Sequence, residues 1–155
     1  MGPLNCTMPQ KHNPSARISV DDALLPPAGT DEIYFEALEG GSCMLPACKR
    51  CGRWNWPVRF RCGDCGTWEN EWKRVDLKGA IYSWTRTWHT FDGLEAIRMP
   101  FVSLVVDLDC APGIRLLGTL DGTDAAPSMG AAVTGTPQHL TVGGRKIPAI
   151  GWRLA

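Results

Sequence analysis

Apolar and polar residues alternate along the second half of the chain, from residue 78 onward. In an extended strand this alternation puts one face in a core and the other in solvent. Glycine-containing dipeptides typical of turns separate the alternating segments: Asp92-Gly93, Pro112-Gly113, Asp121-Gly122 and Gly143-Gly144. The pattern predicts five β-strands, over residues 80–87, 101–108, 114–120, 132–142 and 146–153. Five short strands favour a small closed barrel, because closure removes exposed strand edges.

A helical period precedes the strands. Tyr34 and Leu38 lie four positions apart, which puts both side chains on one face of an α-helix. Thr30 is the predicted N-cap, and Gly40-Gly41 is the predicted stop. A helix this short is marginal alone, so its apolar face is expected to pack on the rest of the protein or on another chain.

The chain divides into four predicted parts: a flexible, proline-rich tail over residues 1–29, a short helix over 30–43, a zinc ribbon over 44–75 and a barrel over 76–155. The tail has no sustained period, and its prolines remove backbone donors. Disorder is the simpler expectation for it, and ordering against a partner is the alternative. The predicted fold class is mostly β, with a short N-terminal helix, a four-cysteine ribbon and a five-stranded OB-fold barrel.

Composition narrows the functional classes. Sixteen basic residues balance sixteen acidic ones among 155 residues, so the net charge gives no reason to expect strong nucleic-acid or anionic-membrane binding. No apolar run approaches the roughly 18–20 residues that span a bilayer. The first thirty residues lack an apolar stretch of signal-peptide type, so a cytoplasmic location is expected.

Four of the seven cysteines form two tight pairs, with ten residues between the pairs. The spacing lets each pair sit at a turn, and the spacer is long enough to bring the turns together. Four thiolates then complete a tetrahedral shell, which predicts one structural zinc ion held by Cys48, Cys51, Cys62 and Cys65. Two disulfides in an exported protein are the weaker alternative, and iron can occupy the same ligands. Four protein ligands leave no open position for catalysis.

The sequence shows no catalytic motif. The remaining cysteines and the histidines form no recognisable nucleophile–base pattern: Cys6, Cys43, Cys110, His12, His89 and His139. Neither a phosphate-binding loop nor a paired-carboxylate signature is present. The sequence therefore predicts that this chain has no catalytic residues, and it favours a binding or scaffolding protein. Nucleic-acid binding and partner binding both remain open, and an exposed tip on Trp54 or Trp56 would suit partner docking.

The order of parts resembles the thiolase-associated proteins that join a rubredoxin-like zinc ribbon to an OB-fold. The segments that carry the resemblance are YFEALEG at 34–40, CKRCG at 48–52, WPVR at 56–59, CGDC at 62–65, GAIYSWT at 79–85, PFV at 100–102, VDL at 106–108, RLLG at 115–118 and MGAAV at 129–133. The resemblance implies an accessory, non-enzymatic subunit of a hetero-oligomer with a thiolase-fold catalytic subunit. The catalytic cysteine and histidines would lie on that partner, and an acyl-CoA substrate would bind near the interface.

A CoA ligand carries phosphates and an adenine ring, which makes arginines and exposed aromatics candidate contacts. The candidates are Arg86, Arg98, Arg115 and Trp88. Core packing is the expected role of Trp84, because it lies within an alternating strand. A nucleic-acid-binding OB-fold protein and a free-standing acyl-CoA-binding protein are the two alternatives to the accessory subunit.

Overall fold

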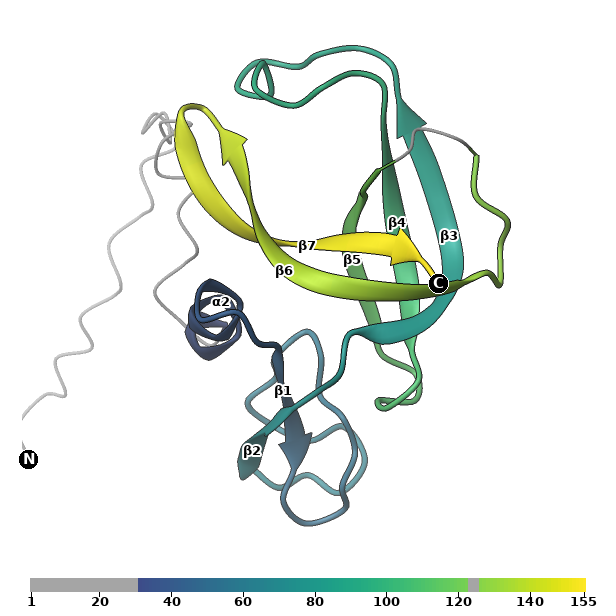
Figure 1. The fold of residues 1–155 in the computed structure, drawn as a ribbon. Coiled ribbons are helices and arrows are strands. Elements are labelled where there is room, and N and C mark those ends of the chain that lie inside the picture. Colours follow the sequence, from purple (N-terminus) through teal and green to yellow (C-terminus); the bar gives the residue numbers. More distant parts are fainter. Residues whose placement is uncertain (1–30, 123–125) are drawn as a thin grey trace, which may run out of the picture.

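The computed structural model describes residues 31–122 and 126–155. Helix α2 (Glu32–Glu39) comes first and is followed by seven strands (Figure 1). The strands are β1 (Met44–Cys48), β2 (Asn70–Arg74), β3 (Lys78–Thr87), β4 (Phe101–Leu108), β5 (Arg115–Leu120), β6 (Ala132–Val142) and β7 (Arg145–Leu154). Each of the five strands predicted from the alternating pattern is present, with ends that differ by at most two residues.

Helix α2 buries the face that the sequence predicted. Tyr34 and Leu38 are buried, whereas Ile33 is 41% exposed. The N-cap position is Asp31 rather than the predicted Thr30, which lies outside the described residues. At the other end Gly41 adopts a φ of 77°, and its N–H donates to the Leu38 carbonyl at 3.0 Å. Glycine reaches this left-handed conformation at little cost, which explains the helix stop.

Strands β1 and β2 pair antiparallel and form the base of the ribbon, with Cys48 opposite Asn70. The long segment between them contains both cysteine turns. The buried side chain of Asn55 holds this segment to the strands, because its Nδ2 donates to Asn70 Oδ1 at 2.7 Å and its backbone N–H donates to the Pro46 carbonyl at 2.9 Å. The buried amide is thus fully paired, as buried polar groups generally are, and it ties the cysteine-bearing segment to both strands.

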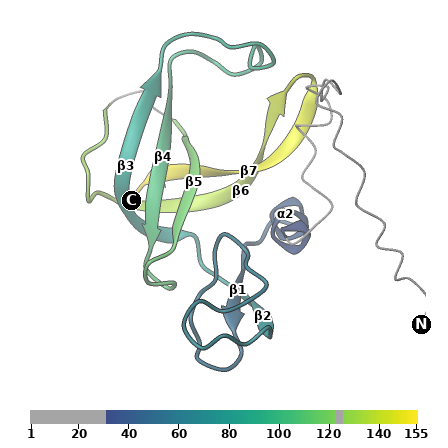
Figure 2. The same ribbon diagram turned by 180° about the vertical axis from the view of Figure 1, so that it is seen from behind.

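The other five strands close into a barrel with the order β3-β4-β5-β7-β6. Most neighbours are antiparallel, but β5 and β7 pair in parallel at Thr119–Gly151 and Leu120–Trp152. Strand β3 pairs with β6 on its other edge and completes the closure. Figure 2 shows the barrel from behind, with the ribbon beyond one end of it and α2 beside the ribbon.

Side chains from alternate strand positions fill the barrel interior. Every second residue of β4 is buried, from Val102 to Leu108. The largest fully buried side chain is Trp152, and two glycines make room for its ring. A Cβ added at Gly135 would lie 2.7 Å from Trp152 Cζ3, and one at Gly118 would lie 2.6 Å from Trp152 Nε1. The indole therefore requires the small residue at Gly135, and at Gly118 the backbone carbonyl of Ile150 excludes a side chain as well.

Helix α2 connects the ribbon to the barrel. Tyr34 stacks on Trp56 of the ribbon, with ring centroids 4.3 Å apart. At the C-terminal end of the helix, the Glu39 carboxylate lies 2.7 Å from His139 Nε2 on β6. These contacts place the apolar face of α2 against the rest of the protein, as the length of the helix predicted.

The predicted fold class is confirmed: the chain is mostly β, with one short helix in the described residues, a four-cysteine cluster and a five-stranded barrel. The predicted tail over residues 1–29 lies outside the described residues. Among the helices of the described part, none is long and apolar enough to cross a membrane.

Candidate functional site

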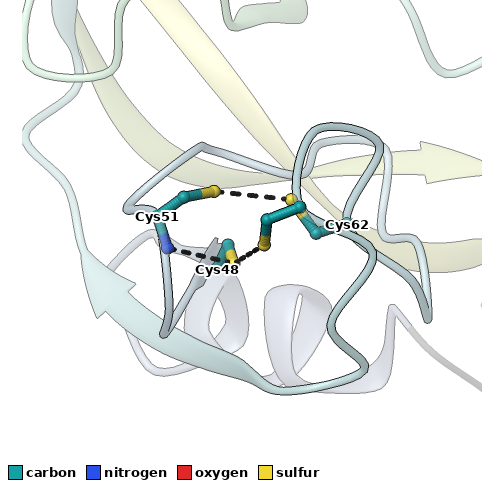
Figure 3. Close-up of side chains that lie close together, drawn as sticks. Cys48, Cys51 and Cys62 are labelled. Carbon is teal, nitrogen blue, oxygen red and sulfur yellow. Dashed lines mark hydrogen bonds between the residues drawn. The ribbon is translucent and has the colours of Figure 1, made fainter.

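The four paired cysteines converge, as their spacing predicted. The sulfur atoms of Cys48, Cys51, Cys62 and Cys65 all lie within 4.8 Å of one another. Sγ of Cys48 is 3.5 Å from Sγ of Cys65, and Sγ of Cys51 is 3.6 Å from Sγ of Cys62. Figure 3 shows the side chains of Cys48, Cys51 and Cys62 pointing toward one another from two separate turns. All six described cysteines are free, which disfavours the two-disulfide alternative.

Both turns use the same backbone hydrogen bonds. The N–H of Gly52 donates to the Cys48 carbonyl at 2.9 Å, and the N–H of Gly66 donates to the Cys62 carbonyl at 3.0 Å. The φ angles of the two glycines are 76° and 74°. Because non-glycine residues rarely adopt this conformation, the glycine after each cysteine pair fixes the shape of its turn.

At Cys48 and Cys62, backbone N–H groups of the turns favour the thiolate. The N–H of Cys51 lies 3.4 Å from Sγ of Cys48 and lowers the pKa of that thiol. The backbone N–H of Cys65 lowers the pKa of the Cys62 thiol to about 7. Metal ligands must be deprotonated, and four sulfurs form the soft donor set that suits zinc or iron. The site therefore fits a tetrahedral metal ion.

An ion pair joins the two cysteine turns. Arg53 Nη1, after the first pair, contacts Asp64 Oδ1 inside the second pair. Both side chains are about half exposed, at 48% and 54%, so solvent screens this pair. The ion pair therefore contributes little to the free energy of folding, and its main effect is to link the two turns.

The other described cysteines lack the surroundings of a nucleophile. Cys43 is buried, and burial raises the pKa of its thiol to about 12, which keeps it protonated at neutral pH. Cys110 is exposed, and its Sγ lies 3.4 Å from the Asp76 carbonyl. His139 pairs with Glu39. Cys6 and His12 lie outside the described residues.

Two of the predicted CoA contacts lie together. Arg86 is near the end of β3, and its Cζ lies 5.3 Å from the ring centroid of Trp88 and 5.8 Å from that of Trp84. Trp88 is 62% exposed, whereas Trp84 packs against the barrel core, in agreement with its predicted role.

The other two predicted contacts lie elsewhere. Arg115 Nε donates to Asp107 Oδ1 at 2.8 Å, and the Arg115 guanidinium lies 3.4 Å from the ring centroid of Tyr82. In the β3–β4 register Arg86 is opposite Val102, whereas Asp107 is five residues farther along β4. Arg86 on β3 and Arg115 on β5 therefore lie beside opposite ends of β4. Arg98 is exposed in the β3–β4 loop. The structure does not gather the four candidates into one site.

Trp54 and Trp56 are half-buried. Both rings pack against the core, Trp56 on Tyr34 and Trp54 beside its bridge partner Ala47. The exposed aromatics of the ribbon are Phe60 and Trp68, each 70% exposed.

Two concave surfaces were not predicted. The first, called here the ribbon cleft, has a volume of about 530 Å³ and lies between the ribbon segment 52–64 and the β4–β5 turn at 112–114. The second, called here the barrel groove, has a volume of about 450 Å³. It is lined mainly by apolar side chains of α2, the β3–β4 loop, β5 and the β6–β7 hairpin, and no charged side chain lines it. Figure 1 shows this loop reaching toward the tip of the hairpin, and Gly143 N–H donates to the Gly93 carbonyl at 2.7 Å there.

Comparison with known proteins confirms the predicted OB-fold resemblance. Residues 72–137 match the family model described as the C-terminal OB-fold domain of ChsH2. A search of curated proteins finds no match. The structure resembles a chain of the solved structure described as "Ltp2-ChsH2(DUF35) aldolase", with a TM-score of 0.69, 22% identity and coverage of 83% of this chain and 98% of the other.

A second solved structure has a related fold. It is a protein of unknown function from the DUF35 family of Sulfolobus solfataricus, with a TM-score of 0.50 and 17% identity. The likeness covers 80% of this chain and 84% of that one. At these identities the two structures show a shared fold.

Proposed function

We propose that this protein is a non-catalytic, zinc-binding subunit of a thiolase-type acyl-CoA complex, with the catalytic cysteine and histidines on its partner. The observation that carries the proposal is the match of the barrel to the ChsH2 OB-fold domain, together with a fold shared with a chain of the Ltp2-ChsH2 aldolase structure. The described residues also offer two concave surfaces without a nucleophile–base pair in them. In this role the protein supports assembly and binds the CoA-linked substrate in the cytoplasm.

The metal has a structural role in this proposal. Cys48, Cys51, Cys62 and Cys65 would hold a zinc ion, and the complete sulfur shell leaves no position for a substrate. The base of the ribbon is a two-stranded sheet, so metal ligation supplies stability that its small core does not. In the predicted division of the chain into residues 1–29, 30–43, 44–75 and 76–155, the metal-binding role belongs to the ribbon at 44–75.

The nucleic-acid alternative receives less support. On OB-fold barrels nucleic acids bind across the second and third strands and the adjoining loops, which here are β4, β5 and the loops at 88–100 and 143–144. The barrel groove lies there and has no charged lining residue, whereas phosphate contacts require basic side chains. Salt-dependent binding of single-stranded oligonucleotides would favour this alternative. CoA binding by a chain that recovers no acyl-CoA enzyme from the native host would favour a free-standing acyl-CoA-binding protein.

The exposed ribbon aromatics provide a test of assembly. Phe60 and Trp68 are each 70% exposed, and Arg61 lies 6.0 Å from the Trp68 ring. Aromatic and arginine side chains dominate the energetics of protein interfaces. The double variant Phe60→Ala, Trp68→Ala is therefore expected to lose at least about tenfold in affinity for the catalytic subunit. The measurement is the amount of partner recovered by affinity purification from the native host.

The matched control is Phe91→Ala, in the β3–β4 loop and 63% exposed. It removes a similar exposed ring away from the ribbon and should leave recovery unchanged. Equal recovery of an acyl-CoA enzyme by the double variant and wild type would show that the ribbon is not the interface. Failure of wild-type protein to recover any such enzyme would contradict the proposed function itself.

A further inference from the structure

The ribbon cleft has walls from two parts of the chain that are far apart in sequence. One wall is the ribbon segment from Gly52 to Asp64, and the other is the turn Pro112-Gly113-Ile114. Figures 1 and 2, which view the molecule from opposite sides, both place this turn beside the cysteine-bearing ribbon segment. The turn is closed by the Ile114 N–H donating to the Ala111 carbonyl at 3.0 Å, and Gly113 has a φ of 79°. A proline followed by a left-handed glycine makes this wall rigid.

The ribbon wall combines cations with aromatic rings. Arg53 and Arg59 line the cleft together with Trp54 and Trp56, and Asp64 is its acidic lining residue. Asp64 is already paired with Arg53, which leaves the cleft with an excess of positive charge. The Arg59 guanidinium meets no carboxylate within residues 31–122 and 126–155, although its backbone carbonyl accepts a hydrogen bond from Asn70 at 2.8 Å. Arginine and tryptophan together suit a phosphate attached to a flat base.

Trp56 belongs to both concave surfaces. It lines the ribbon cleft on one side, and it lines the uncharged barrel groove on the other. A ligand that follows this path has a charged, aromatic end and a long, uncharged arm. The cleft volume of about 530 Å³ also lies in the range of roughly 300–1,000 Å³ that small-molecule sites occupy.

We infer that the ribbon cleft binds the adenosine-phosphate end of a CoA thioester, with the pantetheine arm leading past Trp56 toward the barrel groove. The inference rests on the proposed function and specifies where on this chain the CoA is held. Arg59 contacts the phosphate, and the exposed side of Trp54 or Trp56 carries the adenine. The cleft thus replaces the dispersed Arg86, Arg98 and Arg115 as the nucleotide site.

The test uses the full, zinc-loaded chain and isothermal titration calorimetry. The probes are free CoA, adenosine 3′,5′-bisphosphate and pantetheine. One variant is made on each wall: Arg59→Gln removes the ribbon cation, and Pro112→Glu adds a carboxylate on the exposed barrel turn. Arg50→Gln is the matched control, because Arg50 is an exposed ribbon arginine outside the cleft lining. Zinc content shows that each variant keeps the ribbon.

Wild type is expected to bind CoA and the bisphosphate with similar affinity and pantetheine far more weakly. Each wall variant should raise the Kd for both nucleotides about tenfold or more, since each alters a charge beside the phosphate. Arg50→Gln should stay within about twofold. No change in either wall variant, or no nucleotide binding by wild type, would overturn the inference. Recovery of the catalytic subunit by Arg59→Gln, measured as above, tests the proposed function separately.

Discussion

Replacing Cys48 with alanine is expected to release the metal and unfold the ribbon. Cys48 ends β1, is fully buried and lies 3.5 Å from the Cys65 sulfur, so alanine removes one of four converging ligands. The apparent binding energy of structural zinc is roughly 10–16 kcal/mol in small peptides and acts as folding energy. Two short strands cannot replace a contribution of this size. Cys62→Ala should have the same effect from the opposite turn.

The measurement is the zinc content of purified protein together with tryptophan fluorescence. Wild type should hold one equivalent of zinc, and Cys48→Ala and Cys62→Ala should hold none. Cys110→Ala is the matched control, since Cys110 is exposed and does not belong to the cluster. It should keep the metal. A Cys48→Ala variant that still holds one equivalent would contradict the assignment of the ligands.

Replacing Trp152 with alanine is expected to destabilise the barrel by about 3–5 kcal/mol. Its ring is fully buried and fits between Gly118 and Gly135, which have no side chains to fill the space that the indole would leave. Nε1 of Trp152 is buried without a hydrogen-bond partner in the described part of the chain. Trp152→Phe therefore removes volume without breaking a hydrogen bond, and it should cost less than the alanine variant.

The free energy of unfolding is measured by denaturant titration with zinc in excess, so that the ribbon stays loaded. Trp88→Ala is the control: this ring is 62% exposed, and its loss should change stability by no more than about 0.5 kcal/mol. Gly135→Ala should also destabilise the barrel, because its Cβ would lie 2.7 Å from the indole. Equal stability of Trp152→Ala and Trp88→Ala would show that the indole does not organise the core.

Much of this fold follows from local sequence. The alternation predicts β3 to β7 to within two residues because each of these strands has one face in the core. Tyr34 and Leu38 predict the buried face of α2 in the same way. The metal cluster is also predictable, because the two cysteine pairs and the glycine after each determine the turns without help from the barrel.

What the sequence does not reveal depends on how distant segments meet. The parallel pairing of Thr119 with Gly151 joins β5 to β7, and no local pattern distinguishes it from an antiparallel alternative. The separation of Arg86 from Arg115 follows from strand register, which is settled only when the strands pair. Trp56 shows the same limit, since its contact with Tyr34 joins two modules.

The two concave surfaces change how the chain's basic residues are interpreted. Arginines near β3, β4 and β5 attract attention in the sequence because they flank strands of an OB-fold. In the structure Arg115 is occupied by Asp107, whereas Arg59 faces a cleft. The ribbon and the barrel together therefore place Arg59, and not Arg115, in the lining of this concave surface.

The most direct test of the accessory role is the activity of the reconstituted complex. The enzyme that co-purifies with this chain is separated from it, and acyl-CoA carbon–carbon bond cleavage or formation is assayed for each component alone and for the mixture. The account predicts activity in the mixture and none in the isolated chain, with restoration when zinc-loaded chain is added back to its partner. Turnover by the isolated chain, or full activity of the partner without it, would contradict the account.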